Sequence, residues 1–315
     1  MNLITGHIIK GVAFLFLFLL CCGQVRAEDA GQRGNIDRGK ALVVAFTPQA
    51  FFNVDPRDAI GAARVWIRQA DRKLEYSSET KVVYYTTQLE VESALERNEV
   101  DILLMIADEF INLRDAFNLT PALSTDYGKR FYDELLLLVR EESGITGVGQ
   151  LRGKNLRIEG GQKGTIPMRW LNAMLQAKTS SSAREFFGNI NEFPKANQII
   201  MPVFFGQADA CIASLTSFET MAELNPQISR RLRILEKSPG FVTGIVAIRK
   251  DVRNQRRDAM IDALRDMDGD PKGKQVLTIF RLNRLVNFKT EHLASVEKLF
   301  KTHRAKTEAT DRSKQ

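Results

Sequence analysis

One feature constrains the fold of this chain most. Short, continuous apolar runs alternate with segments in which apolar residues have helical periodicity. The runs are "ALVVAFT" at 41–47, "KVVYYT" at 81–86 and "VDILLMI" at 100–106. Between the first two, apolar residues recur at helical spacing from Ile60 to Leu74. Strands buried on both faces have continuous apolar runs, whereas half-exposed strands alternate. The pattern therefore predicts an α/β fold of mostly parallel sheets flanked by helices.

Helix-start signals mark where the helices of the first part begin. Asp55 precedes Pro56 and is followed by Asp58, which is typical of a helix N-terminus. Thr87 and Glu90 have the spacing of a capping box. A further helix is expected to begin with 107–113, directly after the third apolar run.

The second part repeats this organisation, so we predict two similar α/β lobes. Strands are expected at 156–161, 209–214, 231–239 and 244–251, with an extended segment at 130–140 and helices at 166–176, 196–205, 216–223 and, after 251, in stretches up to 301. The helix at 216 is expected to open with a capping box, Thr216 to Glu219.

The N-terminus predicts export. Lys10 precedes the apolar run "GVAFLFLFLLCCG", which is too short for a comfortable membrane span, and "VRA" follows it. This is the pattern of a signal peptide cleaved after Ala27, which predicts a periplasmic protein. Cys21 and Cys22 leave open a lipoprotein, although Leu19 and Leu20 are not the small residues expected before a lipidated cysteine.

Removal of residues 1–27 leaves Cys211 as the only cysteine, so no internal disulfide is expected. Cys211 lies in an apolar strand and is interpreted as buried packing. The formal net charge is +7, but export argues against a nucleic-acid partner, and a basic exported protein more simply attracts small anions. The polar segment 301–315 has no apolar periodicity and is predicted to be a disordered basic tail.

The stretch "RIEGGQKGTIPMRW", Arg157 to Trp170, is typical of a strand, a turn and a helix start. Glycines allow the backbone to approach a ligand closely, and Thr165 is a good N-cap residue with Pro167 in the first helical turn. Free N–H groups at a helix start favour an anion. A plain strand-to-helix connection also explains the pattern.

The organisation from Ala41 to Val252 resembles the solute-binding proteins of ABC transporters with the type 2 periplasmic fold, in the branch that binds phosphate, phosphite and phosphonate. The resemblance is carried by "DELLLLVREESGITGVGQLRGKNLRIEGGQKGT" and "MPVFFGQADACIASLTSFETMAELNPQISRRLRIL". It implies two lobes joined by two crossing strands, Asp133 to Arg140 and Gly244 to Arg249. Lobe 1 is then expected at 41–132 plus 245–300 and lobe 2 at 133–244. It also implies a monomer without cofactor that passes a small anionic solute to an ABC permease.

The resemblance implies a site of hydroxyls and main-chain amides at helix starts. The matching positions are Gly164 and Thr165 in one loop, with Gln162 and Lys163 beside them, and Ser214, Thr216 and Ser217 in the other. After the first strand, Thr47 and Phe51 are expected to contribute a wall of the cleft, together with Gln49 and Phe52. A histidine found in some phosphonate binders has no counterpart, because His7, His292 and His303 lie near the ends.

Enzymatic function is the rival class, and the residues disfavour it. No histidine lies between the signal peptide and the last helices, which leaves no base for a nucleophile–histidine pair. Asp108 and Glu109 are interpreted as first-turn residues that complement a helix dipole, so no metal site is expected.

Two other roles remain open on the sequence alone. The same bilobed module could, in its ligand-bound state, bind a membrane sensor kinase rather than a permease. A sulfonate or a thiamine precursor could replace the phosphorus oxyanion, since that branch of the fold is shared.

Overall fold

The computed structural model describes residues 41–51, 55–76, 78–128, 130–160, 165–250 and 255–302. The predicted signal peptide, 1–27, and residues 303–315 of the predicted tail lie outside the described residues. Within the described part, no helix has the length and apolar character that a membrane crossing requires.

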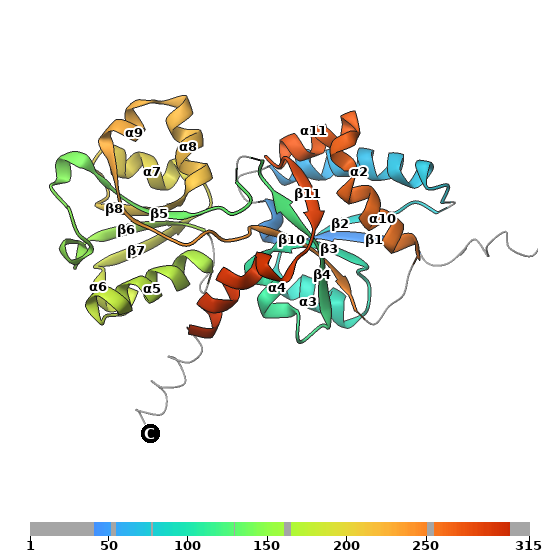
Figure 1. Ribbon diagram of the computed structural model, residues 1–315, viewed down its shortest axis with the longest axis horizontal. Coiled ribbons are helices and arrows are strands. Elements are labelled where there is room, and N and C mark those ends of the chain that lie inside the picture. Colours follow the sequence, from blue (N-terminus) through green and yellow to red (C-terminus); the bar gives the residue numbers. More distant parts are fainter. Residues whose placement is uncertain are drawn as a thin grey trace, which may run out of the picture. The chain divides into compact units, whose positions relative to one another are not determined.

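The first lobe is built on a six-stranded sheet with the strand order β11-β4-β10-β3-β1-β2 (Figure 1). Its strands are β1 (Val43–Phe46), β2 (Lys81–Tyr84), β3 (Ile102–Ile106), β4 (Leu119–Asp126), β10 (Gly244–Arg249) and β11 (Arg284–Asn287). β1 pairs in parallel with β2 and β3, whereas β10 runs antiparallel to β3 and β4. The three predicted apolar runs are thus neighbouring parallel strands.

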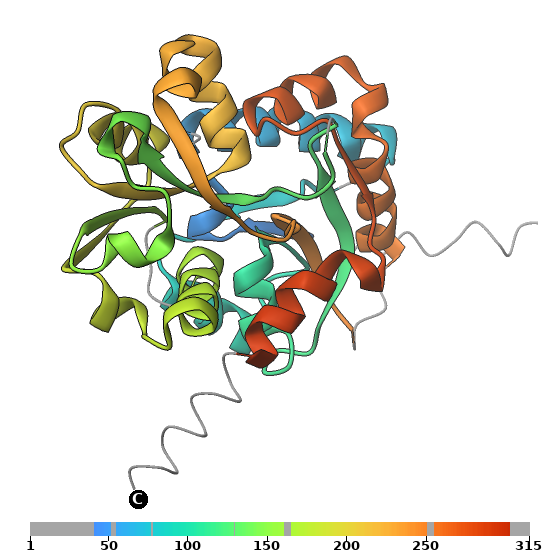
Figure 2. The ribbon, with the colours of Figure 1, turned by 60° about the vertical axis from the view of Figure 1, so that its left-hand side comes forward.

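Helices cover both faces of this sheet because its strands are apolar on both sides. They are α2 (Pro56–Lys73), α3 (Gln88–Glu96), α4 (Ala107–Leu113), α10 (Gln255–Arg265), α11 (Pro271–Ile279), the 3-10 helices η1 (Pro48–Phe51), η4 (Met267–Gly269) and η5 (Thr290–Leu293), and a helix over 294–302. Figures 1 and 2 show α2, α10 and α11 together on one face. Trp66 of α2, Leu264 of α10 and Leu277 of α11 share one hydrophobic core there.

The predicted helix starts of this lobe are confirmed. Asp55 caps α2, its side chain accepting from Arg57 N, and Pro56 is the first helical residue. Thr87 and Glu90 form the predicted capping box at the start of α3.

The second lobe has a five-stranded sheet with the order β7-β6-β8-β5-β9. Its elements are β5 (Leu135–Arg140), η2 (Glu141–Ser143), η3 (Val148–Leu151), β6 (Asn155–Glu159), α5 (Ile166–Thr179), α6 (Ala183–Phe186), β7 (Asn189–Phe193), α7 (Ala196–Phe204), β8 (Ala210–Ser214), α8 (Leu215–Leu224), α9 (Gln227–Arg231) and β9 (Leu232–Lys237). Leu136 and Leu138 face a core with α7 and α8, whereas Leu137 and Val139 face a core with α5 and α6. The run "LLLLV" is therefore buried on both faces.

Two passages of chain join the sheets, one from β4 to β5 and one from β9 to β10. They meet at an antiparallel bridge between Asp133 and Phe241. The predicted two-lobed α/β fold with two crossing segments is confirmed. Both sheets also contain antiparallel pairs, because β10 in the first sheet and β5 in the second run against their neighbours.

Three strands were not predicted. β4 contains Pro121 and several hydroxyl residues, and β7 and β11 are short and largely polar, so none shows a continuous apolar run. Only helical stretches were expected between about 251 and 301, but this part also contains β11, which pairs antiparallel with β4 at the edge of the first sheet.

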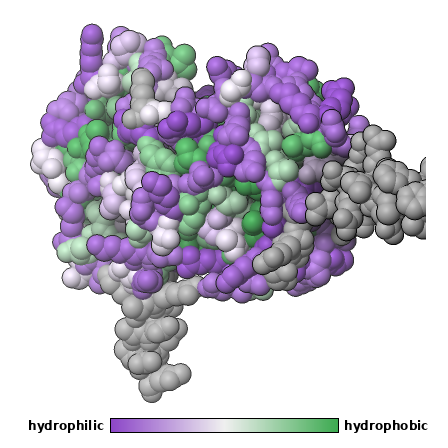
Figure 3. Space-filling model, turned by 45° about the vertical axis from the view of Figure 1, so that its right-hand side comes forward, coloured by the Kyte–Doolittle hydropathy of each residue, from purple (hydrophilic) through white to green (hydrophobic). Residues whose placement is uncertain are grey.

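Figure 3 shows one face of the molecule coloured by hydropathy. Hydrophilic residues dominate this face, and hydrophobic residues are visible in its middle and in smaller groups on either side.

Candidate functional site

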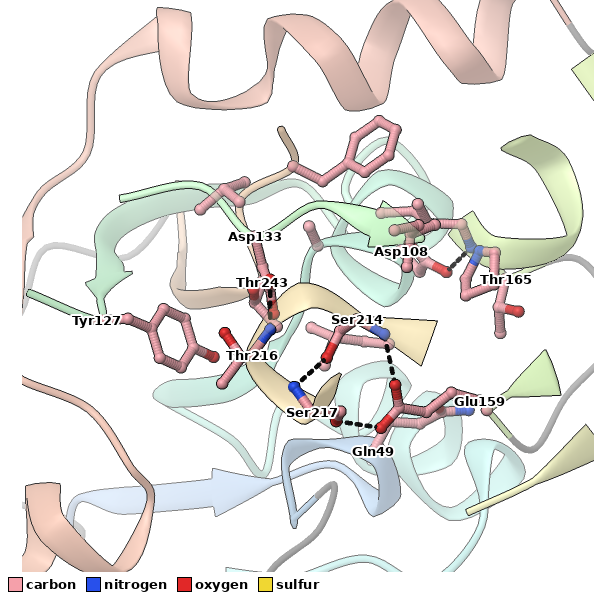
Figure 4. Close-up of a pocket in the computed structure, with 18 of the residues that line it drawn as sticks. Gln49, Asp108, Tyr127, Asp133, Glu159, Thr165, Ser214, Thr216, Ser217 and Thr243 are labelled. Atoms are coloured by element: carbon pink, nitrogen blue, oxygen red, sulfur yellow. Dashed lines mark hydrogen bonds between the residues drawn. The ribbon is translucent and has the colours of Figure 1, made fainter. Parts of the chain in front are cut away.

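A cavity of about 190 Å³ lies where the starts of α4, α5 and α8 approach the crossing segments. Figure 4 shows its lining side chains. The polar residues that line it are Gln49, Asp108, Tyr127, Asp133, Glu159, Thr165, Ser214, Thr216, Ser217, Thr243 and Arg281. Most of the remaining wall is apolar, with Phe241, Val242 and Phe280 among the residues that form it. Concave, mainly apolar sites with a few convergent polar groups are typical of small-molecule binding.

The start of α5 leaves two buried polar atoms unsatisfied. Thr165 is the N-cap, but its side chain makes no cap hydrogen bond, and its Oγ1 is buried without a partner among the described residues. Ile166 N donates to Asp108 Oδ2 at 2.5 Å, while Asp108 Oδ1 has no partner in the described part of the chain. Thr165 and Asp108 are only 8% and 6% exposed. Buried polar atoms of this kind call for a ligand, ion or water.

Burial controls the protonation of the two acidic residues of α4. Desolvation raises the pKa of Asp108 to about 7, although the bond from Ile166 and the positive charge of Arg169 oppose the rise. Desolvation likewise raises the pKa of Glu109 to about 7, against the bond from Thr47. Near neutral pH each carboxyl is therefore protonated for much of the time, so Asp108 can donate as well as accept.

The start of α8 is held by a second carboxylate. Ser214 is the N-cap, and its side chain accepts from Ser217 N at 3.1 Å. Glu159 accepts from Ser214 N at 2.6 Å and from the Ser217 hydroxyl. The predicted capping box at Thr216 to Glu219 is wrong, because α8 begins at Leu215, before Thr216.

A third carboxylate, Asp133, comes from the crossing segment. Its Oδ1 accepts from Thr216 N at 3.2 Å and from Glu134 N at 2.9 Å, and desolvation raises its pKa. The main-chain donors of Ile166, Ser214 and Thr216 are thus bonded to side chains of the protein. A bound solute would rely mainly on side-chain hydroxyls, the protonated form of Asp108, and Arg281.

Arg281 is the only lysine or arginine of the described residues that lines the cavity. It follows α11 and adopts a left-handed backbone conformation with φ of 56°. Glu75, Asn98 and Ser180 have the same φ directly after α2, α3 and α5, so this conformation ends the helix and sets where Arg281 leaves it.

The structure brings together Thr165, Ser214, Thr216 and Ser217, four of the predicted site residues, on the cavity wall. Thr47 is the exception among the described ones. It is fully buried, and its hydroxyl donates to Glu109 Oε2 at 2.6 Å instead of facing a solute. Gln162, Lys163 and Gly164 lie outside the described residues, as does the side chain of Phe51, whose backbone ends η1.

Sequence reasoning missed the four charged residues that line the cavity: Asp108, Asp133, Glu159 and Arg281. Asp108 was interpreted only as a partner of a helix dipole, whereas its side chain reaches the start of α5. All four lie at or near the end of a strand or helix. Position at an element end is the one sequence signal that could have identified them as site residues. Cys211 is buried as predicted, and the described residues contain no group of three His, Cys, Asp or Glu side chains suited to a metal ion.

Comparison with known proteins adds a family and several structural relatives. The family described as "ABC transporter, phosphonate, periplasmic substrate-binding protein" matches residues 68–293. A comparison with curated proteins finds no match.

Three solved structures are similar in fold at low sequence identity. XAC2383 from Xanthomonas citri bound to ATP has a TM-score of 0.65 at 15% identity, covering 83% of this chain and 96% of that one. A binding-protein component of an ABC phosphonate transporter from Pseudomonas aeruginosa has a TM-score of 0.64 at 13% identity, covering 82% and 86%. PhnD1 from Prochlorococcus marinus in complex with methylphosphonate has a TM-score of 0.62 at 14% identity, covering 84% and 98%.

Proposed function

Because this chain belongs to the family of periplasmic substrate-binding proteins of phosphonate ABC transporters, we propose that its cavity captures a small phosphorus oxyanion. The ligand is of the phosphonate type, and the protein delivers it to an ABC permease. The site comprises Thr165, Ser214, Thr216 and Ser217 from the sequence prediction, with Gln162, Lys163 and Gly164 beside Thr165.

The observation that carries this proposal is the pair of unsatisfied atoms at the start of α5. Thr165 Oγ1 and Asp108 Oδ1 are both buried and lack partners among the described residues. A phosphonate oxygen accepts one bond from the threonine hydroxyl and one from Asp108 in its protonated form. The positive end of the α5 dipole favours the negative charge at the same place.

Arg281 supplies the cationic partner. Its guanidinium carries a permanent charge and donors in a fork that fits two oxygens of one phosphonate group. Three acidic side chains also line the cavity, but desolvation raises the pKa of Asp108 to about 7 and so reduces its negative charge near neutral pH. The cavity is thus less repulsive to an anion than a count of its carboxyls implies.

The same proposal covers the role and location of the chain. Residues 1–27 are a cleavable export signal, and the mature protein works in the periplasm as a monomer without a cofactor. Lobe 1 comprises 41–132 and 245–300, and lobe 2 comprises 133–244.

The protein binds and releases its solute without chemical conversion, so it is not an enzyme. Buried Cys211, whose pKa is raised by desolvation, is unsuited to act as a nucleophile.

Substitution of Thr165 by valine tests the site, because it removes the hydroxyl and keeps the shape. Thr165 Oγ1 has no partner among the described residues, so the variant is expected to be as stable as the wild type. Methylphosphonate should bind about ten- to a hundredfold more weakly, the loss expected for one hydrogen bond to a charged group. Isothermal titration calorimetry measures the affinity.

Thr278→Val is the matched control, since Thr278 is exposed on α11 and its hydroxyl donates to Lys274 O. Equal affinity of wild type and Thr165→Val for methylphosphonate would remove Thr165 from the site. Absence of phosphonate binding by the wild type would overturn the proposed function itself.

A further inference from the structure

A second cavity of about 140 Å³ lies inside the first lobe, beside the proposed anion site. Its walls come from the sheet and from α2, α10 and α11, the helices that share one face in Figures 1 and 2. Nearly all of its lining side chains are apolar, among them Val44, Ala63, Trp66, Leu264 and Val276.

The two cavities share part of their walls, so they adjoin each other. The shared residues are Gln49, Ile106, Tyr127, Thr243 and Phe280. Three of these five carry polar groups, whereas the wall beyond them is apolar. Phe280 packs against the inner wall, with its ring stacked on that of Phe46 at 5.9 Å between centroids. The polar groups of the anion site thus adjoin an apolar chamber.

A protein interior seldom leaves a void of this size, because side chains pack at the density of organic crystals. An engineered apolar cavity of about 150 Å³ in another protein stays dry and binds benzene. The second cavity is therefore large enough for a phenyl ring or a chain of about five carbons.

We propose that the second cavity binds the organic substituent of the solute, so that the preferred ligand is a phosphonate with an alkyl or aryl group of about five or six carbons. This inference rests on the proposed function, because the phosphonate group must occupy the first cavity for its substituent to enter the second. Inorganic phosphate and methylphosphonate fill the first cavity only and leave the apolar chamber empty.

A series of n-alkylphosphonates tests the proposal on the wild-type protein. Each methylene that enters an apolar site tightens binding about fourfold. Calorimetry is expected to show pentylphosphonate binding about a hundredfold or more tightly than methylphosphonate, with no further gain for octylphosphonate. Trp66 lines the chamber and is one of two tryptophans, so its fluorescence should change with pentylphosphonate much more than with methylphosphonate. Trp66→Phe identifies the contribution of that residue to the signal.

Ala63→Leu fills the chamber from α2, where Ala63 is buried. The variant should bind pentylphosphonate at least tenfold more weakly than the wild type does. Its affinity for methylphosphonate should change by less than twofold. Gly61→Leu is the control, because it adds the same side chain to an exposed position of the same helix with nothing within 4 Å of the added Cβ. Melting curves test whether both variants fold. If Ala63→Leu does not fold, the alkylphosphonate series on the wild-type protein still decides the question.

The outcomes separate the two proposals. Equal affinities for methylphosphonate and pentylphosphonate in the wild type would overturn the chamber and leave the proposed function standing. Binding of no phosphonate would overturn the proposed function and this inference together.

Discussion

Asp108 acts as an internal partner of the α5 helix start. Its Oδ2 accepts a hydrogen bond from Ile166 N. This main-chain N–H is therefore not available to an anionic ligand. The other carboxyl oxygen of Asp108 lacks a partner among the described residues. Arg169 of α5 favours the charged form, while Glu109 and above all burial favour the neutral one.

The raised pKa values of Asp108 and Glu109 predict that the protein loses stability as the pH rises. The unfolded carboxyls release their protons near pH 4, whereas the folded ones keep theirs up to about pH 7. Between these values the native state binds more protons, so the free energy of unfolding falls with pH across this window. We expect the free energy of unfolding to be lower at pH 8 than at pH 5 by about 2–3 kcal/mol for each carboxyl, or on the order of 5 kcal/mol for the pair.

Asp108→Asn should reduce this slope and raise the stability at pH 8, because an amide has no proton to lose. Urea denaturation at several pH values measures the effect. Asp115→Asn is the control, since the Asp115 side chain is 81% exposed. A slope that is equal in wild type and Asp108→Asn would contradict the assignment of the buried proton to Asp108.

At the scale of elements, α8 depends on its cap at Ser214. The side chain accepts from Ser217 N, and the same turn is tied to Glu159 of β6. Loss of such an N-cap costs about 1 kcal/mol. Ser214→Ala should therefore lower the melting temperature by about 2–4 °C, measured by differential scanning calorimetry. Ser229→Ala, at an exposed serine of α9, should change it much less; an equal effect of both would contradict the capping role.

Elements with a local signal were predictable from the sequence. The starts of α2 and α3 and the strands β1, β3 and β8 follow from caps and apolar runs within a few residues. β4 and β11 have no such signal, since each is defined by its neighbour in the sheet. The start of α8 was misplaced because Ser214 and Thr216 are both plausible caps, and only the contact with Glu159 distinguishes them.

The site was predictable where it consists of helix starts and unpredictable where distant elements converge. Thr165, Ser214 and Ser217 lie at helix starts that the sequence marks. Asp108 meets Ile166, 58 residues along the chain, only through the pairing of two lobes. Thr47 looked equally suitable but bonds to Glu109, which no local pattern indicates.

At the scale of the whole molecule, the two crossing segments place residues of both lobes around one cavity. Asp108 belongs to the first lobe and Ile166 to the second, and Arg169 of α5 lies 4.0 Å from the ring centre of Phe300 in the last helix. Closure of such lobes around a solute gives selectivity, because the wrong solute leaves buried polar groups unpaired.

A thermal-shift measurement on residues 28–315, the chain without the proposed export signal, tests the central claim most directly. A ligand that binds only the native state, at about a hundredfold over its Kd, adds roughly 2.7 kcal/mol of stability, or about 5–10 °C. We predict such a rise with methylphosphonate or a longer alkylphosphonate, and little or none with sulfate or ATP. No rise with any phosphorus oxyanion, in a sample that unfolds cooperatively, would contradict the account.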